Sequence, residues 1–284
     1  MPDPAMEAKT GTTTASTPFP DSPRVVYDKN PLFEVLCQLR FPHILRIETE
    51  IPAPFQEKIR KEFPFFRERV ASPAIPELPP GMPDAFVKAI QAAAAGPGAP
   101  KAYEFLTADK VWTVTLTRGS LAIKTTKYTR WEEFKAYMTG PLQALTEIYA
   151  PAFFTRIGLR YQDLIQRSNL GLSGTAWPEL LNPTIAGELA SPELAGAVEE
   201  AFTQVLVRLP SESGQVRVRH GLVQVAGSDE ECYPIDSDFY REGEVATDEA
   251  PRTLDSFNRQ SGRLFRWCIT DRLHQAMEPK PVLE

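Results

Sequence analysis

The strongest constraint on the fold of this chain is the alternating segment NPLFEVLCQLRFP, residues 30–42. In a strand, successive side chains point to opposite faces of the sheet. One set of side chains is wholly apolar: Phe33, Val35, Cys37, Leu39 and Phe41. The other set is mixed: Leu32, Glu34, Leu36, Gln38 and Arg40. The segment is therefore predicted to be a strand with one face in the core and the other only partly shielded from water.

Further strand and helix patterns follow along the chain. Strands are predicted over 102–107, 110–118, 120–128, 153–166, 202–209, 214–225 and 231–240. Apolar side chains recur at helical spacing over 53–70, 129–149 and 254–277. Pro64 is expected to end or kink the first helix, and Gly140 with Pro141 to bend the second. Clustered strands between helices predict an α+β fold, with a mainly antiparallel mixed sheet and helices packed on one face.

The composition indicates one domain with two accessory segments. Residues 1–24 are rich in Thr, Ser, Pro and Ala and have few large apolar side chains, so they are predicted to be a disordered tail. The proline- and alanine-rich residues 71–100 are predicted to be a surface insertion. Residues 25–284 are expected to form a single α+β domain, in which two topologically related halves, 25–167 and 168–279, share a core.

The composition also favours a soluble protein of a reducing compartment. No apolar run approaches the roughly 18–20 residues that cross a bilayer, so no membrane partner is expected. The first residues lack the pattern of a secretory signal, and three scattered cysteines suit neither a disulfide framework nor a CxxC zinc site. We therefore expect a cytoplasmic location.

The charge balance argues against a protein built around nucleic acid. The formal net charge is −6. Residues 1–167 nevertheless hold 21 basic and 18 acidic side chains, against 10 and 19 in residues 168–284. An anionic partner of the first half, nucleic acid included, therefore stays open.

Polar side chains on the mixed faces of the predicted strands form the first candidate site. If those strands are neighbours, their polar rows line one surface of the sheet. The planar fork of arginine suits phosphate and carboxylate ligands. The candidate ligand-binding residues are Glu34, Gln38, Arg40, Arg156, Arg160, Arg217 and Arg219. The alternatives are an internal ion-pair network, in which nearby acids neutralise the arginines, and a subunit interface.

Asp236 and Asp238 form the second candidate site. Residues two apart on a strand share a face, so both carboxylates could hold a divalent cation such as Mg²⁺ or Mn²⁺. The alternative is a solvated strand face or structural pairing with arginines. The sequence contains no phosphate-binding loop, dinucleotide-binding glycine motif, zinc-protease motif or nucleophile elbow, and no other cofactor is expected.

Asp163 is a separate case, because it falls on the apolar face of its predicted strand beside Tyr161. A buried carboxylate must find a partner or take up a proton. We expect Asp163 to lie at a strand end, where it reaches helix amides or Arg167.

Five segments carry a resemblance to a known family: YDKNPLFEVLCQLRFP, APFQEKIRKEFP, RIGLRYQDLI, PIDSDFYREGE and LFRWCITDRLHQAMEP. Together they resemble a sporadically distributed family of uncharacterised bacterial proteins, over roughly residues 25–279. The resemblance implies a soluble bacterial protein of one extended α+β domain. It transfers no catalytic residue, and the scattered occurrence of the family is compatible with an accessory or defence role.

These observations favour a non-enzymatic cytoplasmic binding or interaction protein, whose polar sheet face contacts a protein partner or an anionic small molecule. The alternative is a metal-assisted enzyme acting on a phosphate-containing substrate, with the two aspartates on the cation and Arg40 and Arg160 on phosphate. A nucleic-acid-binding protein is a second alternative, and a homo-oligomer is also open.

Overall fold

The computed structural model describes residues 18–70, 101–210, 214–224 and 230–282. Its strands are β1 (Val25–Tyr27), β2 (Leu32–Arg40), β3 (Phe65–Val70), β4 (Lys101–Leu106), β5 (Trp112–Thr117), β6 (Ser120–Thr125), β7 (Phe154–Gln166), β8 (Ala201–Arg208), β9 (Gln215–Gln224), β10 (Glu231–Val245) and β11 (Pro279–Pro281). Within these described residues, nine strands form one antiparallel sheet in the order β3-β4-β5-β6-β2-β7-β10-β9-β8, and β1 pairs with β11.

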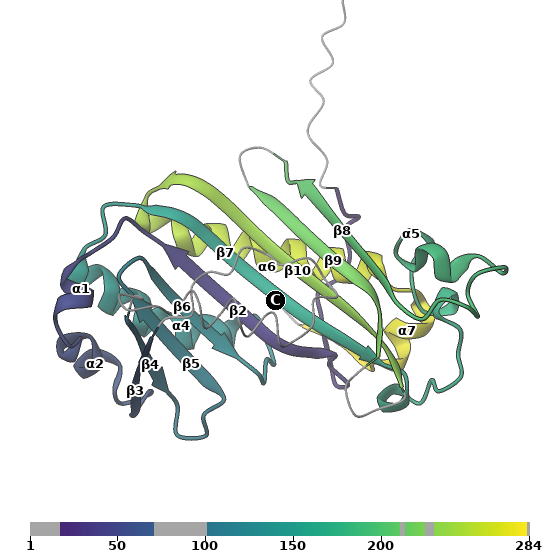
Figure 1. The fold of residues 1–284 in the computed structure, drawn as a ribbon, viewed down its shortest axis with the longest axis horizontal. Coiled ribbons are helices and arrows are strands. Elements are labelled where there is room, and N and C mark those ends of the chain that lie inside the picture. Colours follow the sequence, from purple (N-terminus) through teal and green to yellow (C-terminus); the bar gives the residue numbers. More distant parts are fainter. Residues whose placement is uncertain (1–17, 71–100, 211–213, 225–229, 283–284) are drawn as a thin grey trace, which may run out of the picture.

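The helices cover one face of this sheet. They are α1 (Arg46–Thr49), α2 (Ala53–Ile59), α4 (Trp131–Tyr149), α5 (Pro183–Ala186), α6 (Ala250–Cys268) and α7 (Asp271–Ala276), with short 3₁₀ turns at Ser168–Leu170, Trp177–Glu179, Gly187–Ala190 and Thr247–Glu249. Figure 1 shows α4 and α6 behind the sheet, α1 and α2 at one end of the long axis, and α5 and α7 at the other. The predicted α+β class, with an antiparallel sheet and helices on one face, is confirmed.

The core lies between the sheet and the two long helices. In α6, buried side chains recur every three or four residues, which places them on one stripe of the helix. Each large apolar side chain buried there stabilises the fold by roughly 1.5–3 kcal/mol. The stripe packs against β7 and β10, while α4 packs against α2 and β6. The fully or almost fully buried side chains include Val35, Cys37, Leu39, Phe134, Leu145, Ile157, Leu159, Leu254, Phe257 and Leu264.

Strand β7 joins the two ends of the sequence within the sheet. It lies between β2, near the N-terminus, and β10, near the C-terminus. Each half of the chain contributes a three-strand meander followed by a long helix, β4-β5-β6 with α4 and β8-β9-β10 with α6. Side chains that are far apart in the sequence therefore become neighbours on the central strands.

The helical pattern predicted over 53–70, in which Pro64 is expected to end or kink the helix, does not form a helix after Pro64. Helix α2 ends at Ile59, and the residues after Pro64 form the edge strand β3. A turn after Ile59 leads to Pro64, which has no amide hydrogen and disfavours a helical conformation at the residue before it, so the helix does not resume there. The aromatic and charged side chains from Phe65 onward then pair with β4.

The single predicted helix over 254–277 is two helices. Helix α6 ends at Cys268, and Ile269 forms an extended bridge to Leu181. Thr270 begins α7, because its side-chain oxygen accepts a hydrogen bond from the backbone of Leu273.

The boundary predicted for the N-terminal tail is also wrong. Phe19 is buried, and its ring lies 6.0 Å from the ring of Trp267. Residues 18–24 are therefore part of the described structure, and Asp21 forms an ion pair with Arg263 of α6. Residues 1–17, and the insertion predicted at 71–100, lie outside the described residues. No helix of the described part has the length and apolar character needed to span a membrane.

Candidate functional site

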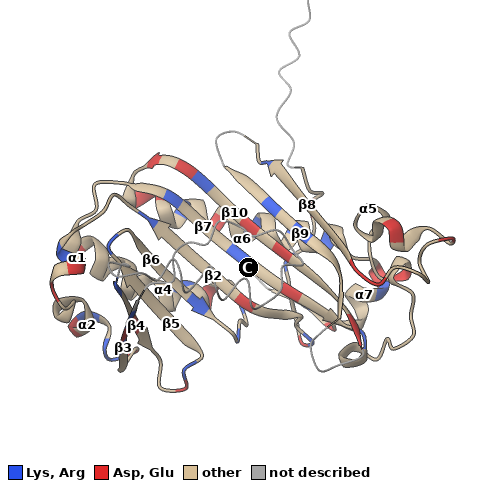
Figure 2. Cartoon of the chain, in the orientation of Figure 1, with Lys and Arg blue, Asp and Glu red and all other residues tan. Residues whose placement is uncertain are grey.

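The predicted polar face is assembled on the four strands β2, β7, β10 and β9. Asp236 lies opposite Gln162 on one side and Arg219 on the other, and Arg160 lies opposite both Asp238 and Leu36. Figure 2 shows these residues as blue and red segments along the central strands, with α6 lying behind the sheet. The sequence prediction that these polar rows meet on one surface agrees with this register.

The two aspartates of this face are held by arginines. Asp236 accepts hydrogen bonds from Nε and Nη2 of Arg160, both at 2.6 Å, and from Nη1 of Arg219 at 3.0 Å. Asp238 accepts two bonds of 2.9 Å from Nη2 of Arg156. Both aspartate side chains are only 14% exposed. Forked, partly buried pairs of this kind are strong and geometrically specific.

The remaining candidates of the polar face also have partners. Lys124 forms an ion pair of 2.7 Å with Glu34, and Nε of Arg40 donates to the side chain of Gln38 at 2.9 Å. The guanidinium of Arg217 lies over the ring of Tyr240, 5.6 Å from its centre. For Glu34, Arg156, Arg160 and Arg219 the geometry thus corresponds to the ion-pair alternative, in which opposite charges neutralise one another.

The same contacts bear on the predicted metal site. Every hydrogen bond described above for Asp236 and Asp238 comes from an arginine, so a cation would have to displace guanidinium groups. Among the described residues, no three His, Cys, Asp or Glu side chains gather in an arrangement that could hold a metal ion.

A cavity of about 370 Å³ lies on the opposite side of the sheet, beneath α6. Its floor is formed by β2, β7 and β10 and one wall by α6. The other walls are formed by β1 and by residues 128–131, the last of which begins α4. Several lining residues, among them Arg24, Arg130 and Arg259, are exposed, so the cavity opens to solvent between β1 and α6. A space of this size falls within the range of about 300–1,000 Å³ typical of small-molecule sites.

Asp163 on β7 lines this cavity and is only 5% exposed. The predicted contact with Arg167 is wrong. Arg167 donates to the backbone of Thr175 and to Glu231, and its guanidinium lies over the ring of Trp177. Within the described residues, no hydrogen bond or ion pair satisfies the Asp163 carboxyl. Burial, with a further contribution from the charge of Asp236, raises its pKa well above the usual range.

A β-bulge sets the composition of the cavity floor. Leu32 lies opposite Asp163 and Glu34 lies opposite Gln162, so Phe33 has no counterpart on β7. Because of the extra residue, the side chains before the bulge point to the opposite faces of the sheet from those that strict alternation predicts. Leu32 therefore lines the cavity, and Phe33 is 48% exposed. The predicted placement of Phe33 in the core and of Leu32 on the polar face is wrong for this reason.

A hydroxyl and amide network forms one side of the cavity. The Tyr161 hydroxyl donates to Oδ1 of Asn258 at 2.9 Å, and the Tyr128 hydroxyl donates to the same oxygen at 3.5 Å. Tyr161 is fully enclosed, which raises the pKa of its hydroxyl well above the usual value. The Tyr27 hydroxyl on β1 contacts Nδ1 of His274 at 2.8 Å, and burial raises the pKa of Tyr27 to about 12. These hydroxyls stay protonated at neutral pH.

Arginines surround the opening. Those that line the cavity are Arg24, Arg130, Arg259, Arg263 and Arg266. Four of them have acidic partners: Arg24 and Arg130 share Glu132, Arg263 pairs with Asp21, and Arg266 pairs with Asp271. Hydrogen bonds from Arg24, the largest cause, lower the pKa of Glu132 to about 2. Five arginines thus face three paired carboxylates, and burial favours the neutral form of Asp163, so positive charge is in excess around the opening.

The sequence marked one residue of this cavity as unusual and gave no indication of the cavity itself. Asp163 was conspicuous as a carboxyl on an apolar strand face. Tyr27, Tyr128 and Asn258 carried no signal of their own, because their roles depend on how β1 and α6 lie against the sheet.

Comparison with known proteins gives no assignment for this site. A scan against models of known protein families found no match. A search of curated proteins likewise found none.

Proposed function

We propose that this protein is a non-catalytic binding protein that holds a small molecule in the cavity beneath α6. The observation that carries the proposal is Asp163, a carboxyl that is 5% exposed, lines a cavity and has no partner among the described residues. An unpaired buried polar group costs about 1–3 kcal/mol. A ligand that satisfies it recovers that free energy on binding.

The chemistry of the cavity defines the ligand class. Burial favours the neutral form of the Asp163 carboxyl, and that form presents one donor beside one acceptor, which matches the edge of a primary amide or a comparable nitrogen heterocycle. Leu32, Ile235 and Phe265 supply apolar surface around it. Arg259 lines the cavity, is exposed and forms no ion pair within the described residues, so it suits a carboxylate or phosphate at the other end of the molecule. The expected ligand therefore has an amide-like head and an anionic end.

The polar sheet face is the weaker candidate for the binding site. Its arginines already bind Asp236 and Asp238, so an anion would have to compete with two short ion pairs. The same pairs weaken the support for a metal-assisted enzyme and for a nucleic-acid surface on this face.

Ligand-observed NMR with 4-carbamoylbenzoate, which has an amide head and a carboxylate end, tests the proposal. We expect saturation transfer from the wild-type protein to this probe. The N,N-dimethyl amide, which lacks the donor, and benzamide, which lacks the anionic end, should bind more weakly. No transfer to 4-carbamoylbenzoate, or equal transfer to all three probes, overturns the proposal.

Variants at the carboxyl sharpen the same experiment. Asp163→Asn keeps one donor and one acceptor, so it should retain binding at every pH. The wild type should lose binding as the pH rises through the pKa of Asp163, and Asp163→Leu should lose it throughout. Thermal unfolding of both variants serves as the control for folding.

The cellular setting is part of the proposal. Cys37, Cys232 and Cys268 are free and buried, which suits a reducing compartment such as the bacterial cytoplasm. The resemblance of the sequence to a scattered bacterial family is compatible with an accessory or defence role there.

A further inference from the structure

Strand β8 ends the sheet with an unusually apolar edge. Within the described residues it pairs with β9 alone, so one row of its backbone amides and carbonyls faces outward. Three large apolar side chains on it are about half exposed: Phe202 at 46%, Val205 at 45% and Leu206 at 52%. An edge with unpaired backbone groups and apolar side chains is a template for another strand.

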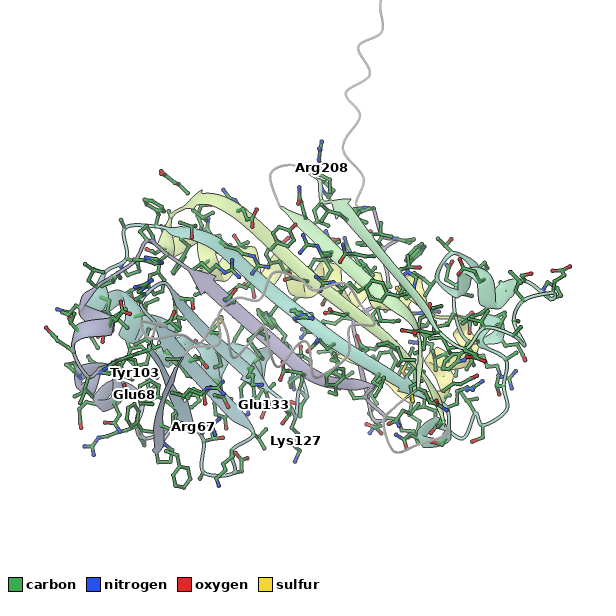
Figure 3. The ribbon with its side chains drawn as sticks, viewed as in Figure 1. Arg67, Glu68, Tyr103, Lys127, Glu133 and Arg208 are labelled. Atoms are coloured by element: carbon green, nitrogen blue, oxygen red, sulfur yellow. The ribbon has the colours of Figure 1, made fainter. Side chains whose placement is uncertain are left out.

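The opposite edge of the sheet has the usual protection against such pairing. Strand β3 carries Arg67, Glu68 and Arg69 in succession, and Figure 3 labels the first two at that edge. Charged side chains on an edge strand oppose pairing with a further strand. Strand β8 has no charged residue from Phe202 to Val207.

The sequence of β8 is complementary to itself in one antiparallel register. If Gln204 lies on a two-fold axis, Phe202 lies opposite Leu206 of the second copy, on the face that also carries Arg217 and Arg219. In the same register Glu200 lies opposite Arg208. Every apolar contact and every charge pair then occurs twice, as the symmetry of a homodimer requires.

The charges at the two ends of β8 favour a second copy of the chain as the partner of this edge. Glu188, Glu199 and Glu200 line a shallow hollow beside Phe202 at the start of the strand. Arg208 lies at the other end, where Figure 3 shows it projecting away from the sheet. Antiparallel pairing brings the basic end of each copy to the acidic end of the other, and electrostatic complementarity of this kind sets the register of an interface.

We propose that two copies of this chain associate through antiparallel pairing of β8 with β8, centred on Gln204, to form one continuous sheet. The pairing does not involve the cavity, so it stands independently of the proposed ligand. A single strand pair buries less area than a standard interface, and the dimer should therefore dissociate on dilution.

Sedimentation velocity measurements test the association. They should cover protein concentrations from about 1 µM to about 1 mM, because this range includes the dissociation constants of weak complexes. We expect a shift from monomer to dimer across this range. Glu200→Arg or Arg208→Glu alone should raise the dissociation constant at least about tenfold, since like charges then face each other. The double variant should restore association, while Arg252→Glu, an equal charge change at an exposed position of α6, should have no effect.

Cysteine cross-linking tests the register. Residues directly opposite in an antiparallel pair have Cβ atoms about 4.5–5.5 Å apart, close to the reach of a disulfide. Gln204→Cys should therefore form an intermolecular disulfide on mild oxidation, whereas Thr203→Cys, opposite Val205, should not. A monomer at every concentration, a dimer unaffected by charge reversal, or equal cross-linking of both variants overturns the proposal.

Discussion

Leu32 and Asp163 lie directly opposite each other where β2 pairs with β7, and both line the cavity beneath α6. The next residue pair joins Glu34 to Gln162, so the bulge at Phe33 separates the cavity floor from the ion-paired face. One extra residue thus decides which side chains of β2 face the cavity and which face the arginines. Bulges next to functional sites commonly re-aim side chains in this way.

The buried carboxyl predicts a dependence of stability on pH. The pKa of Asp163 is higher in the folded than in the unfolded chain, so the folded state binds more protons above about pH 4. Its contribution to stability therefore falls as the pH rises toward the folded pKa, by up to about 1.4 kcal/mol per pH unit. Asp163→Asn removes this term. In urea unfolding at several pH values, the free energy of unfolding of Asp163→Asn should increase relative to that of the wild type as the pH rises. A difference between the two proteins that does not change with pH would contradict the assignment.

The ion-pair network predicts strong coupling between Asp236 and Arg160. Asp236→Asn weakens the bonds to two arginines and should destabilise the fold by about 1–3 kcal/mol. Arg160→Met removes the main partner of the same carboxylate. Since both changes break one contact, the double variant should lose less stability than the two single losses together. Denaturant unfolding of all four proteins measures this coupling, and simple additivity would count against the network.

A cation titration separates the network from the predicted metal site. Because Asp236 and Asp238 are held by arginines, addition of Mg²⁺ or Mn²⁺ should leave the melting temperature unchanged. A rise in melting temperature that disappears in Asp236→Asn would show that the carboxylates bind the cation instead. Asp248→Asn, at an exposed turn before α6, provides the control.

Two phenylalanines test the bulge. Phe257 is fully buried on α6, and Phe257→Ala should cost about 3–5 kcal/mol. Phe33 is 48% exposed, and Phe33→Ala should change stability by no more than about 0.5 kcal/mol. Strict alternation along β2 would place Phe33 in the core, so a loss similar to that of Phe257→Ala would refute the bulge. Chemical denaturation of the two variants provides the measurement.

The thiols should be unreactive until the protein unfolds. Cys37 is fully buried, and burial raises its pKa to about 12. Burial likewise raises the pKa of Cys268. The thiolate is the reactive form, so a thiol reagent at pH 8 should modify neither residue in the native protein and both in denaturant. Mass mapping of the modified sites distinguishes them, and rapid native labelling of Cys37 would disagree with the packing of β2.

Alternation and helical spacing were sufficient to predict the fold class and the polar face. Arg160 and Asp236 could be placed on one surface because each lies on a strand whose polar side is regular. The bulge could not be predicted, since nothing distinguishes Phe33 from its apolar neighbours until β7 sets the register. Asp163 could be recognised as unusual, but its lack of a partner depends on how α6 and β1 pack against the sheet. Long-range packing, which no local pattern encodes, determined each of these differences.

The pairing of β1 with β11 has a consequence for when the cavity can form. Strand β1, which includes Tyr27, is synthesised well before its strand partner, residues 279–281. Until those residues emerge, the wall that β1 provides lacks its anchor. The cavity is therefore complete only after β11 has been synthesised, although the strand that β11 anchors is made well before it.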